Sequence, residues 1–243
     1  MNIRLDIQYK GTDFSGWQFQ PNEVTVQGEI EKTLAKVTGQ KIAVYGAGRT
    51  DAGVHALGQV ANFRIEHHLP PEKYKDALNF YLPKTILIMK SSLVPDDFHA
   101  RKSAHWRHYR YIIDRERTAL YFEYRWEYPF PLDKDRMNTI AEYIKGRHDF
   151  EAFCTISSLK DNNECEIYSS GWIEKRSLLI YEIRANRFLH SMVRSLVGLM
   201  IEAGKNNDYL TLEQFRDIMK SGNHAKIGNV APARGLYLVA VGY

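Results

Sequence analysis

The chain has 243 residues, with 33 Lys and Arg against 29 Asp and Glu, which gives a formal net charge of +4 and a pI near 8.9. With 44% hydrophobic and 26% charged residues, its composition excludes disordered and fibrous classes. No apolar run reaches the ~18 residues of a membrane span, and the first residues lack the apolar core of a signal peptide. Two cysteines are too few for a disulfide framework. We therefore expect a cytoplasmic protein with one large domain or two small ones.

The first half of the chain mixes strand and helix patterns. Apolar and polar residues alternate over residues 3–9, which predicts a strand. Apolar residues at helical spacing follow and stop at Gly39, a typical helix end. Later patterns predict, in chain order, a strand at 41–45, a glycine-rich loop at 46–56, a strand at 58–65, a helix at 73–82, and extended segments at 85–94 and 105–113.

The second half repeats this mixture without a regular alternation of strand and helix. Its patterns predict a helix ending near Gly146, a hairpin over 171–186, an apolar helix over 187–204, a helix that Thr211 and Gln214 open as a capping box, and a strand over 235–243. We therefore predict an α+β fold with mainly antiparallel sheet in two similar halves, 1–104 and 105–243.

The loop GAGRTDAGVHA, from Gly46 to Ala56, holds a single carboxylate among small residues. Its glycines permit positive φ and a close approach of another backbone or a ligand. Asp51 could therefore act as a general base or nucleophile, and Arg49 could keep it ionised or bind phosphate. The alternative is an ordinary turn, in which Gly and Asp are common for conformational reasons.

Basic and aromatic residues are densest between Arg101 and Arg117. On a strand, Arg107, Tyr109 and Tyr111 share one face, and His108 and Arg110 share the other. Rings among arginines suit RNA, because rings stack on bases and guanidinium groups bind phosphate. One core face and one solvated face would explain the pattern equally well.

The apolar helix expected over 187–204 carries a stripe of polar residues: Arg187, His190, Ser191, Arg194 and Glu202. A solvated face is the simpler interpretation. Arg194, however, has apolar neighbours on both sides and would need a partner if covered, and Asp51 is the natural candidate. No metal site is predicted, since the histidines of the basic stretch point to opposite faces and the cysteines lack a ligand pattern. No cofactor site is predicted either.

Several segments, in order along nearly the whole chain, closely resemble the TruA-type tRNA pseudouridine synthases. They are YKGTDFSGWQFQP, TVQGEIEKTL, GAGRTDAGVHALGQVANF, VPDDFHARKSAHWRHYRYII, RANRFLHSMVRSLVG and APARGLYLVAVGY. The resemblance implies a pseudouridine-synthase fold, with two related halves and flanking helices around a basic cleft. It implies isomerisation of uridine to pseudouridine in the tRNA anticodon stem-loop, at positions 38 to 40. It also implies a homodimer.

The resemblance also implies roles for individual residues. Asp51 matches the aspartate that attacks the target uridine, at C1′ of the sugar or C6 of the base. Arg49 matches the arginine that helps open the stem, and Arg194 matches the helix arginine that pairs with the catalytic carboxylate. Tyr109 matches the tyrosine that stacks on the target base, and Leu236 matches an apolar residue packed against that base. We expect further substrate contacts from Arg107, Arg110 and His55.

Two other functions remain to be separated from this one. The first is a non-catalytic RNA-binding protein on the same scaffold, and the second is a synthase that acts on other RNA positions. The chain departs from the family pattern over residues 154–172, where acids stand in place of a threonine and an arginine. We expect this departure to affect RNA contacts rather than the chemistry.

Overall fold

The structure is a computed structural model that describes residues 1–66, 69–155, 161–205, 210–222 and 230–243. It forms two compact units, one of Met1–His105 with Tyr237–Tyr243 (unit 1) and one of Trp106–Leu236 (unit 2). The long segment of unit 1 ends one residue beyond the boundary expected at 104. The last strand, expected in the second half, belongs to unit 1 because Tyr237 and Leu238 pair in parallel with His55 and Ala56.

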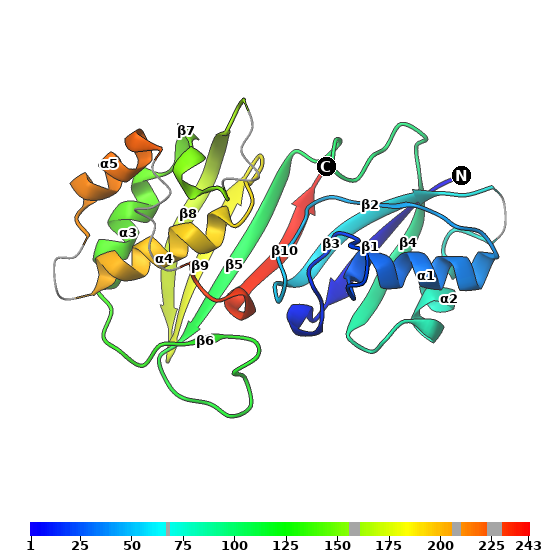
Figure 1. The fold of residues 1–243 in the computed structure, drawn as a ribbon, viewed down its shortest axis with the longest axis horizontal. Helices are drawn as coiled ribbons and strands as arrows, with labels where there is room; N and C mark the ends of the chain where they lie inside the picture. The colour runs from blue at the N-terminus through cyan, green and yellow to red at the C-terminus, as the bar shows by residue number, and fades with distance from the viewer. Residues whose placement is uncertain (67–68, 156–160, 206–209, 223–229) are drawn as a thin grey trace. The chain divides into compact units, whose positions relative to one another are not determined.

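Unit 1 is built on a sheet in the order β4-β1-β3-β10, with β2 also paired to β3 (Figure 1). The β1/β3, β1/β4 and β2/β3 pairs are antiparallel, and β10 runs parallel to β3. Its strands are β1 (Asn2–Tyr9), β2 (Val44–Gly46), β3 (His55–Arg64), β4 (Ile86–Val94) and β10 (Leu236–Gly242). The strand expected at 41–45 is therefore shorter than predicted and starts only at Val44.

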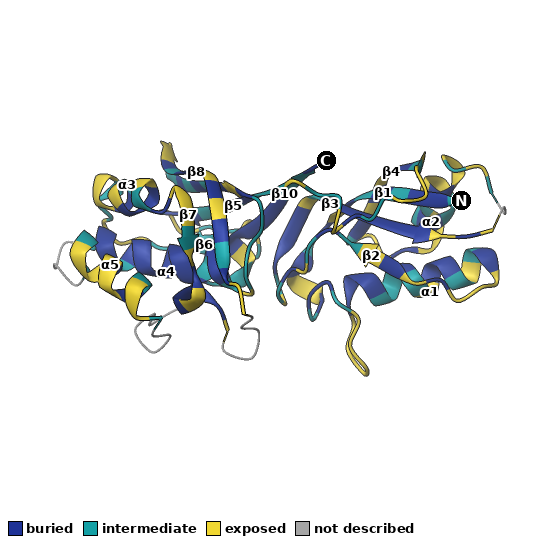
Figure 2. Ribbon diagram, turned by 90° about the horizontal axis from the view of Figure 1, so that it is seen from above, coloured by how far each residue is buried: buried dark blue, intermediate teal, exposed yellow. Residues whose placement is uncertain are grey.

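Two helices and a short 3-10 turn complete unit 1: α1 (Val26–Thr38), α2 (Lys73–Tyr81) and η1 (Gly11–Asp13). Thr25 caps α1 by accepting a hydrogen bond from the Gly28 amide, and Gly39 ends it at φ 73°. This confirms the helix end predicted at Gly39. On β1, Ile3, Leu5 and Ile7 are fully buried, as the alternating pattern predicts. Figure 2 shows the same alternation of buried and less buried residues along the strand.

Unit 2 has a sheet in the order β5-β9-β8-β7, with β6 paired in parallel to β5 and the other pairs antiparallel. The expected α+β class with mainly antiparallel sheet is thus confirmed. The strands are β5 (Trp106–Asp114), β6 (Trp126–Glu127), β7 (Gly146–Asp149), β8 (Glu164–Lys175) and β9 (Leu178–Ala185). The helices are α3 (Lys134–Tyr143), α4 (Met192–Gly204) and α5 (Leu212–Ser221), with 3-10 turns η2 (Glu151–Phe153) and η5 (Ala233–Gly235). No helix in the described ranges could cross a membrane.

The helix expected over 187–204 begins only at Met192. Ser191 has a φ of 60°, in the left-handed region, and this conformation separates the preceding residues from the helix. The predicted polar stripe is therefore wrong, because Arg187 and His190 do not lie on the helix that carries Arg194. By contrast, the capping box of Thr211 and Gln214 is present and confirms the start of α5. Residues 156–160 of the divergent segment 154–172 lie outside the described residues.

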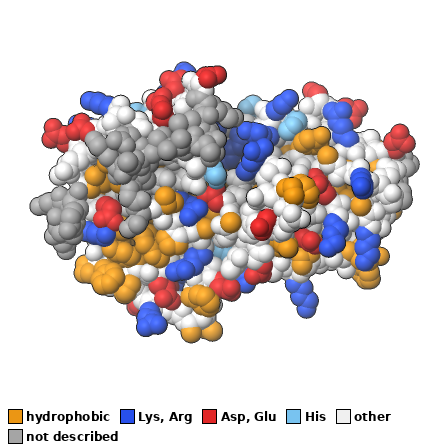
Figure 3. Space-filling view, viewed as in Figure 1, with side chains coloured by type: hydrophobic (Ala, Val, Ile, Leu, Met, Phe, Trp, Pro, Cys, Tyr) orange, Lys and Arg blue, Asp and Glu red, His pale blue; other side chains and the backbone are white. Residues whose placement is uncertain are grey.

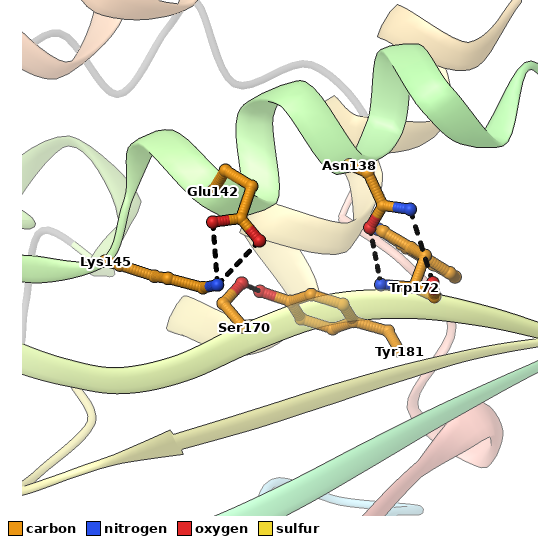
Figure 4. A network of polar contacts seen from close by, with 6 residues as sticks. All are labelled: Asn138, Glu142, Lys145, Ser170, Trp172 and Tyr181. Carbon is orange, nitrogen blue, oxygen red and sulfur yellow. Dashed lines mark hydrogen bonds and ion pairs between the residues drawn. The ribbon is translucent and has the colours of Figure 1, made fainter.

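A side-chain amide joins α3 to the sheet of unit 2 (Figure 4). The Oδ1 atom of Asn138 accepts a hydrogen bond from the Trp172 amide at 2.8 Å, and its Nδ2 atom donates to the Trp172 carbonyl at 3.3 Å. Nearby, the hydroxyls of Ser170 and Tyr181 lie 2.8 Å apart in the interior. This pairing explains how the strongly buried Tyr181 keeps a polar partner.

We expect Asn138→Leu to destabilise unit 2 by about 1–3 kcal/mol, because it leaves two backbone groups of Trp172 without these partners. Urea unfolding measures this loss. Glu142→Ala is the matched control on the same helix, since the Glu142–Lys145 ion pair is exposed and contributes less than about 1 kcal/mol. Equal stabilities of the two variants would contradict a bridging role for Asn138.

Candidate active site

The loop segment Gly46–Ala56 runs from the last residue of β2 into the first residues of β3 and is fixed through its backbone. The Ala47 amide donates to the Val60 carbonyl at 2.8 Å, and the Gln59 side chain donates to the Gly48 carbonyl at 2.8 Å. Gln59 is fully buried, so its side chain anchors the loop from the interior of the unit. Within the loop, the Val54 amide donates to the Asp51 carbonyl at 3.1 Å and closes a turn at the aspartate. Asp51 is half-buried and Arg49 is exposed.

A second segment, Gly11–Trp17, lies directly against this loop. The Trp17 amide donates to the Thr50 carbonyl at 3.1 Å, and the Gly53 amide donates to the Phe14 carbonyl at 3.3 Å. A Cβ atom at Gly11 would lie 1.9 Å from the Val54 carbonyl oxygen, so no larger residue fits there. The backbones of the two segments touch, which explains why small residues predominate around the single carboxylate.

Two buried side chains connect the same loop to the sheet. The hydroxyls of Tyr9 and Thr50 lie 2.7 Å apart, and burial raises the pKa of Tyr9. His55 is 1% exposed, its Nδ1 atom accepts a hydrogen bond from the Gly11 amide at 3.0 Å, and its ring stacks on Tyr237. These contacts make His55 a residue that positions the loop, and its direct contact with substrate stays a prediction.

We expect Gly16→Ala to reduce activity, because Gly16 has a φ of 94° and an added Cβ would lie 2.7 Å from the Thr50 carbonyl oxygen. The loop carrying Asp51 would have to shift. Gly39→Ala is the matched control, since Gly39 has a φ of 73° but no atom within 4 Å of the added Cβ. Thermal unfolding and turnover of both variants measure the difference. A loss of turnover no greater than in Gly39→Ala would show that close packing at Gly16 does not fix the loop.

In unit 2, the sequence-predicted residues on β5 lie on both faces of the sheet. Tyr109 is 7% exposed, and its ring meets the Phe188 ring edge-on at 5.0 Å. Arg107 donates to the Asn186 carbonyl at 2.9 Å. Arg110 lies on the opposite face, where its Nε donates to Glu182 at 2.6 Å. Tyr109 and Arg110 therefore face different surroundings.

Arg194, on α4, holds the segment that leads to Leu236. Its Nε donates to the Ala231 carbonyl at 2.8 Å, and the Ala231 amide donates back to the Arg194 carbonyl at 3.2 Å. The Tyr111 hydroxyl donates to the Pro232 carbonyl at 2.7 Å. Leu236 follows the η5 turn and is 5% exposed. Within unit 2, Arg194 and Tyr111 therefore both bind the segment Ala231–Pro232, which precedes Leu236.

Within unit 1, Arg49, Asp51 and His55 all lie on the loop segment Gly46–Ala56, which hydrogen bonds hold against the Gly11–Trp17 segment and β3. Asp51 and Arg194 belong to different units, and their pairing stays a prediction. The sequence interpretation assigned no positioning role to the residues that hold the loop and the Arg194 segment: Tyr9, Gly11, Gly16, Gln59 and Tyr111. The two glycines of YKGTDFSGW were a usable signal, since glycines spaced within an aromatic loop often mark close backbone contact.

The chain is similar to known proteins along nearly its whole length. The sequence model of a family described as tRNA pseudouridine synthase matches residues 7–101 and 140–243. A protein of Brachyspira hyodysenteriae named tRNA pseudouridine synthase A is 45% identical over 240 residues, which cover 97% of this chain and 96% of that protein. Proteins of the same name from Dictyoglomus thermophilum and Rippkaea orientalis are 44% and 43% identical, covering 100% and 99% of this chain and 100% and 83% of their own lengths. The resemblance seen in the motifs is confirmed, and the chain belongs to the tRNA pseudouridine synthase family.

Proposed function

We propose that this protein converts uridine to pseudouridine in the anticodon stem-loop of tRNA, at positions 38 to 40, with Asp51 as the nucleophile. The bond between N1 of uracil and C1′ of ribose breaks, and the base turns and rejoins the sugar through C5. The proton on C5 leaves and N1 gains one, so the atoms of substrate and product balance. A uridine within a stem must first leave the stack before any side chain can reach it.

The main support for this proposal is that hydrogen bonds to neighbouring segments hold the loop Gly46–Ala56 of unit 1 in place. A nucleophile accelerates a reaction only if it is held where the reacting atom will lie, and a mobile carboxylate would lose that advantage. Backbone hydrogen bonds at Ala47, Gly53 and Val54 hold the loop on both sides of Asp51. The aspartate is half-buried, so it remains accessible to a substrate. A plain surface turn would not need this degree of fixation.

The proposed roles in unit 2 follow its contacts. Tyr109 stands on a strand with its ring supported by Phe188, which suits a ring that stacks on a flipped base. Arg194 holds the segment before Leu236, which we propose as the apolar contact of the base. Arg107 and Arg110 are proposed substrate contacts through phosphate, and Arg49, exposed beside Asp51, would help open the stem.

Tritium release tests the proposal directly. Unmodified tRNA transcripts labelled at C5 of uridine must lose tritium to water if pseudouridine forms. We expect release, with the new pseudouridines mapping to positions 38 to 40. Release with other positions modified would overturn the substrate assignment and keep the chemistry. Binding of tRNA without release would identify a non-catalytic RNA-binding protein instead.

We propose further that the working form is a cytoplasmic homodimer, as the family resemblance implies. Large apolar side chains in unit 2 are well exposed in the single chain, and a partner subunit would cover such side chains: Leu120 at 79%, Phe122 at 53% and Phe130 at 63%. Light scattering after size-exclusion chromatography measures the mass of the assembly. A monomer at micromolar concentration would contradict this part of the proposal.

A further inference from the structure

An exposed tyrosine stands immediately before the loop that carries Asp51. Tyr45 is the central residue of β2. It follows the buried Val44 and precedes the half-buried Gly46, and its side chain is 48% exposed. Its backbone is held by pairing with Asn62 on β3. A Cβ at Gly46 would lie 2.5 Å from the Trp17 ring, so the chain beside Tyr45 is closely packed. The tyrosine ring is thus displayed from a fixed backbone.

The ring of His99 lies against Tyr45, with the two ring centres 5.3 Å apart and the planes tilted by 44°. His99 belongs to the connection that follows β4, and the Nδ1 atom of His99 accepts a hydrogen bond from the Arg101 amide at 3.1 Å. The His99 amide donates to the Ser103 hydroxyl at 3.1 Å. The connection therefore fixes the orientation of the imidazole beside the tyrosine.

Buried asparagines tie this connection to the sheet. The side chain of Asn2 donates to the carbonyls of Pro95 and Phe98, and Asn62 accepts from the Ala100 amide at 2.9 Å. The Tyr243 hydroxyl donates to the Ala100 carbonyl at 2.8 Å. Both asparagines are almost completely buried, and the bond from Ala100 to Asn62 is buried with them. The connection is therefore held in one conformation before any ligand binds.

Positive charge gathers around His99. Burial and the cations Lys102, Arg101 and Arg64 lower the pKa of His99, which favours the neutral imidazole. All three cations are exposed. Asp96 and Asp97 also lie on the connection, and the Asp96 carbonyl accepts a hydrogen bond from Arg64. Figure 3 shows Lys or Arg, histidine and hydrophobic side chains side by side along the upper edge of unit 1.

We infer that Tyr45, His99, Arg64, Arg101 and Lys102 form a second RNA-binding surface, which holds tRNA through phosphate contacts and one stacked base outside the catalytic loop. The inference rests on the proposed function, because it takes tRNA as the ligand. A neutral imidazole and a phenol present flat faces for stacking, and the surrounding cations match the phosphates on either side of an unstacked nucleotide. Stacking of this kind does not depend on which base is present, so the surface would not require a particular nucleotide sequence.

Filter binding of unmodified tRNA to the full-length protein tests this surface without requiring turnover. We expect Tyr45→Ala to weaken binding about tenfold, the scale of one lost base stack, and Tyr45→Phe to bind like the wild type. We expect Lys102→Glu to weaken binding and to reduce the slope of log Kd against log salt by about 1. For both weakened variants, kcat at saturating tRNA should stay unchanged in the tritium assay.

Unit 1 offers matched controls for both changes. Tyr81 is 45% exposed, lies on α2, and has Lys36 4.0 Å above its ring. Lys75 is an exposed lysine of the same helix. Tyr81→Ala and Lys75→Glu should leave tRNA binding within about twofold of the wild type.

Three results would overturn the inference. Equal binding losses in the control variants would show a general charge or stability effect, and a fall in kcat without weaker binding would place Tyr45 in the catalytic machinery. A change of oligomeric mass in Tyr45→Ala would show that the ring contacts protein rather than RNA. If the wild type binds tRNA but releases no tritium, the proposed function fails, and the binding comparison still decides whether this surface exists.

Discussion

Asp51→Asn should abolish turnover and leave tRNA affinity nearly unchanged. The amide has the shape of the carboxylate but cannot act as a nucleophile, so we expect a loss of about ten-thousand-fold or more, the scale seen when a covalent nucleophile is removed. The fold should survive, because the backbone of the loop is held by Gln59, Thr50 and Gly53 rather than by the aspartate side chain alone. Tritium release under single-turnover conditions measures the loss, and filter binding measures the affinity.

The matched control for this change is Asp76→Asn, which removes an exposed carboxylate of α2 in the same unit. It should retain full turnover. If Asp51→Asn keeps more than a few per cent of the wild-type rate, Asp51 is not the nucleophile. If Asp51→Asn instead loses affinity in parallel with turnover, the loop binds RNA rather than performing chemistry.

Arg194→Met should damage both stability and turnover, with turnover affected at least as strongly. Methionine fills the volume of the arginine stem but leaves the Ala231 carbonyl without its donor, which costs about 1–3 kcal/mol. The segment leading to Leu236 would lose one of its attachments to α4. If Arg194 also pairs with Asp51, as we predict, the carboxylate loses that partner as well. We expect turnover to fall about 100- to 1000-fold, the effect of removing one electrostatic stabiliser from an active site.

Two further variants separate the contributions of Arg194. Arg194→Lys keeps the charge but lacks the Nε donor, so it should restore part of the turnover while remaining destabilised. Arg216→Met removes an exposed helical arginine of unit 2 that lies over Tyr143 and should leave turnover unchanged. Denaturant unfolding and tritium release for all three variants give the comparison. Full activity in Arg194→Met would show that Arg194 contributes only its hydrogen bond to Ala231 and has no role in the reaction.

The elements that the sequence predicted well are those governed by local signals. The end of α1 at Gly39, the capping box of α5 and the hairpin of β8 and β9 each depend on a few consecutive residues. The start of α4 was predicted too early, because the apolar pattern continues through residues 187–191 while Ser191 adopts a left-handed conformation. Nothing in the pattern of hydrophobic residues distinguishes such a residue from a helical one, since its conformation depends on the surrounding structure.

The sequence by itself determined the α+β class, the family, and the residues that carry the proposed chemistry, because motifs such as GAGRTDAGVHA combine unusual composition with fixed spacing. Only the tertiary structure decided how those residues are held. Three contacts join segments that are distant along the chain. They are the close packing of Gly11 and Gly16 against the loop that carries Asp51, the hydrogen bond from Arg194 to Ala231, and the pairing of β10 with β3 in unit 1. Composition and periodicity describe neighbours in sequence, whereas these contacts depend on where the folded backbone returns and how closely it can approach.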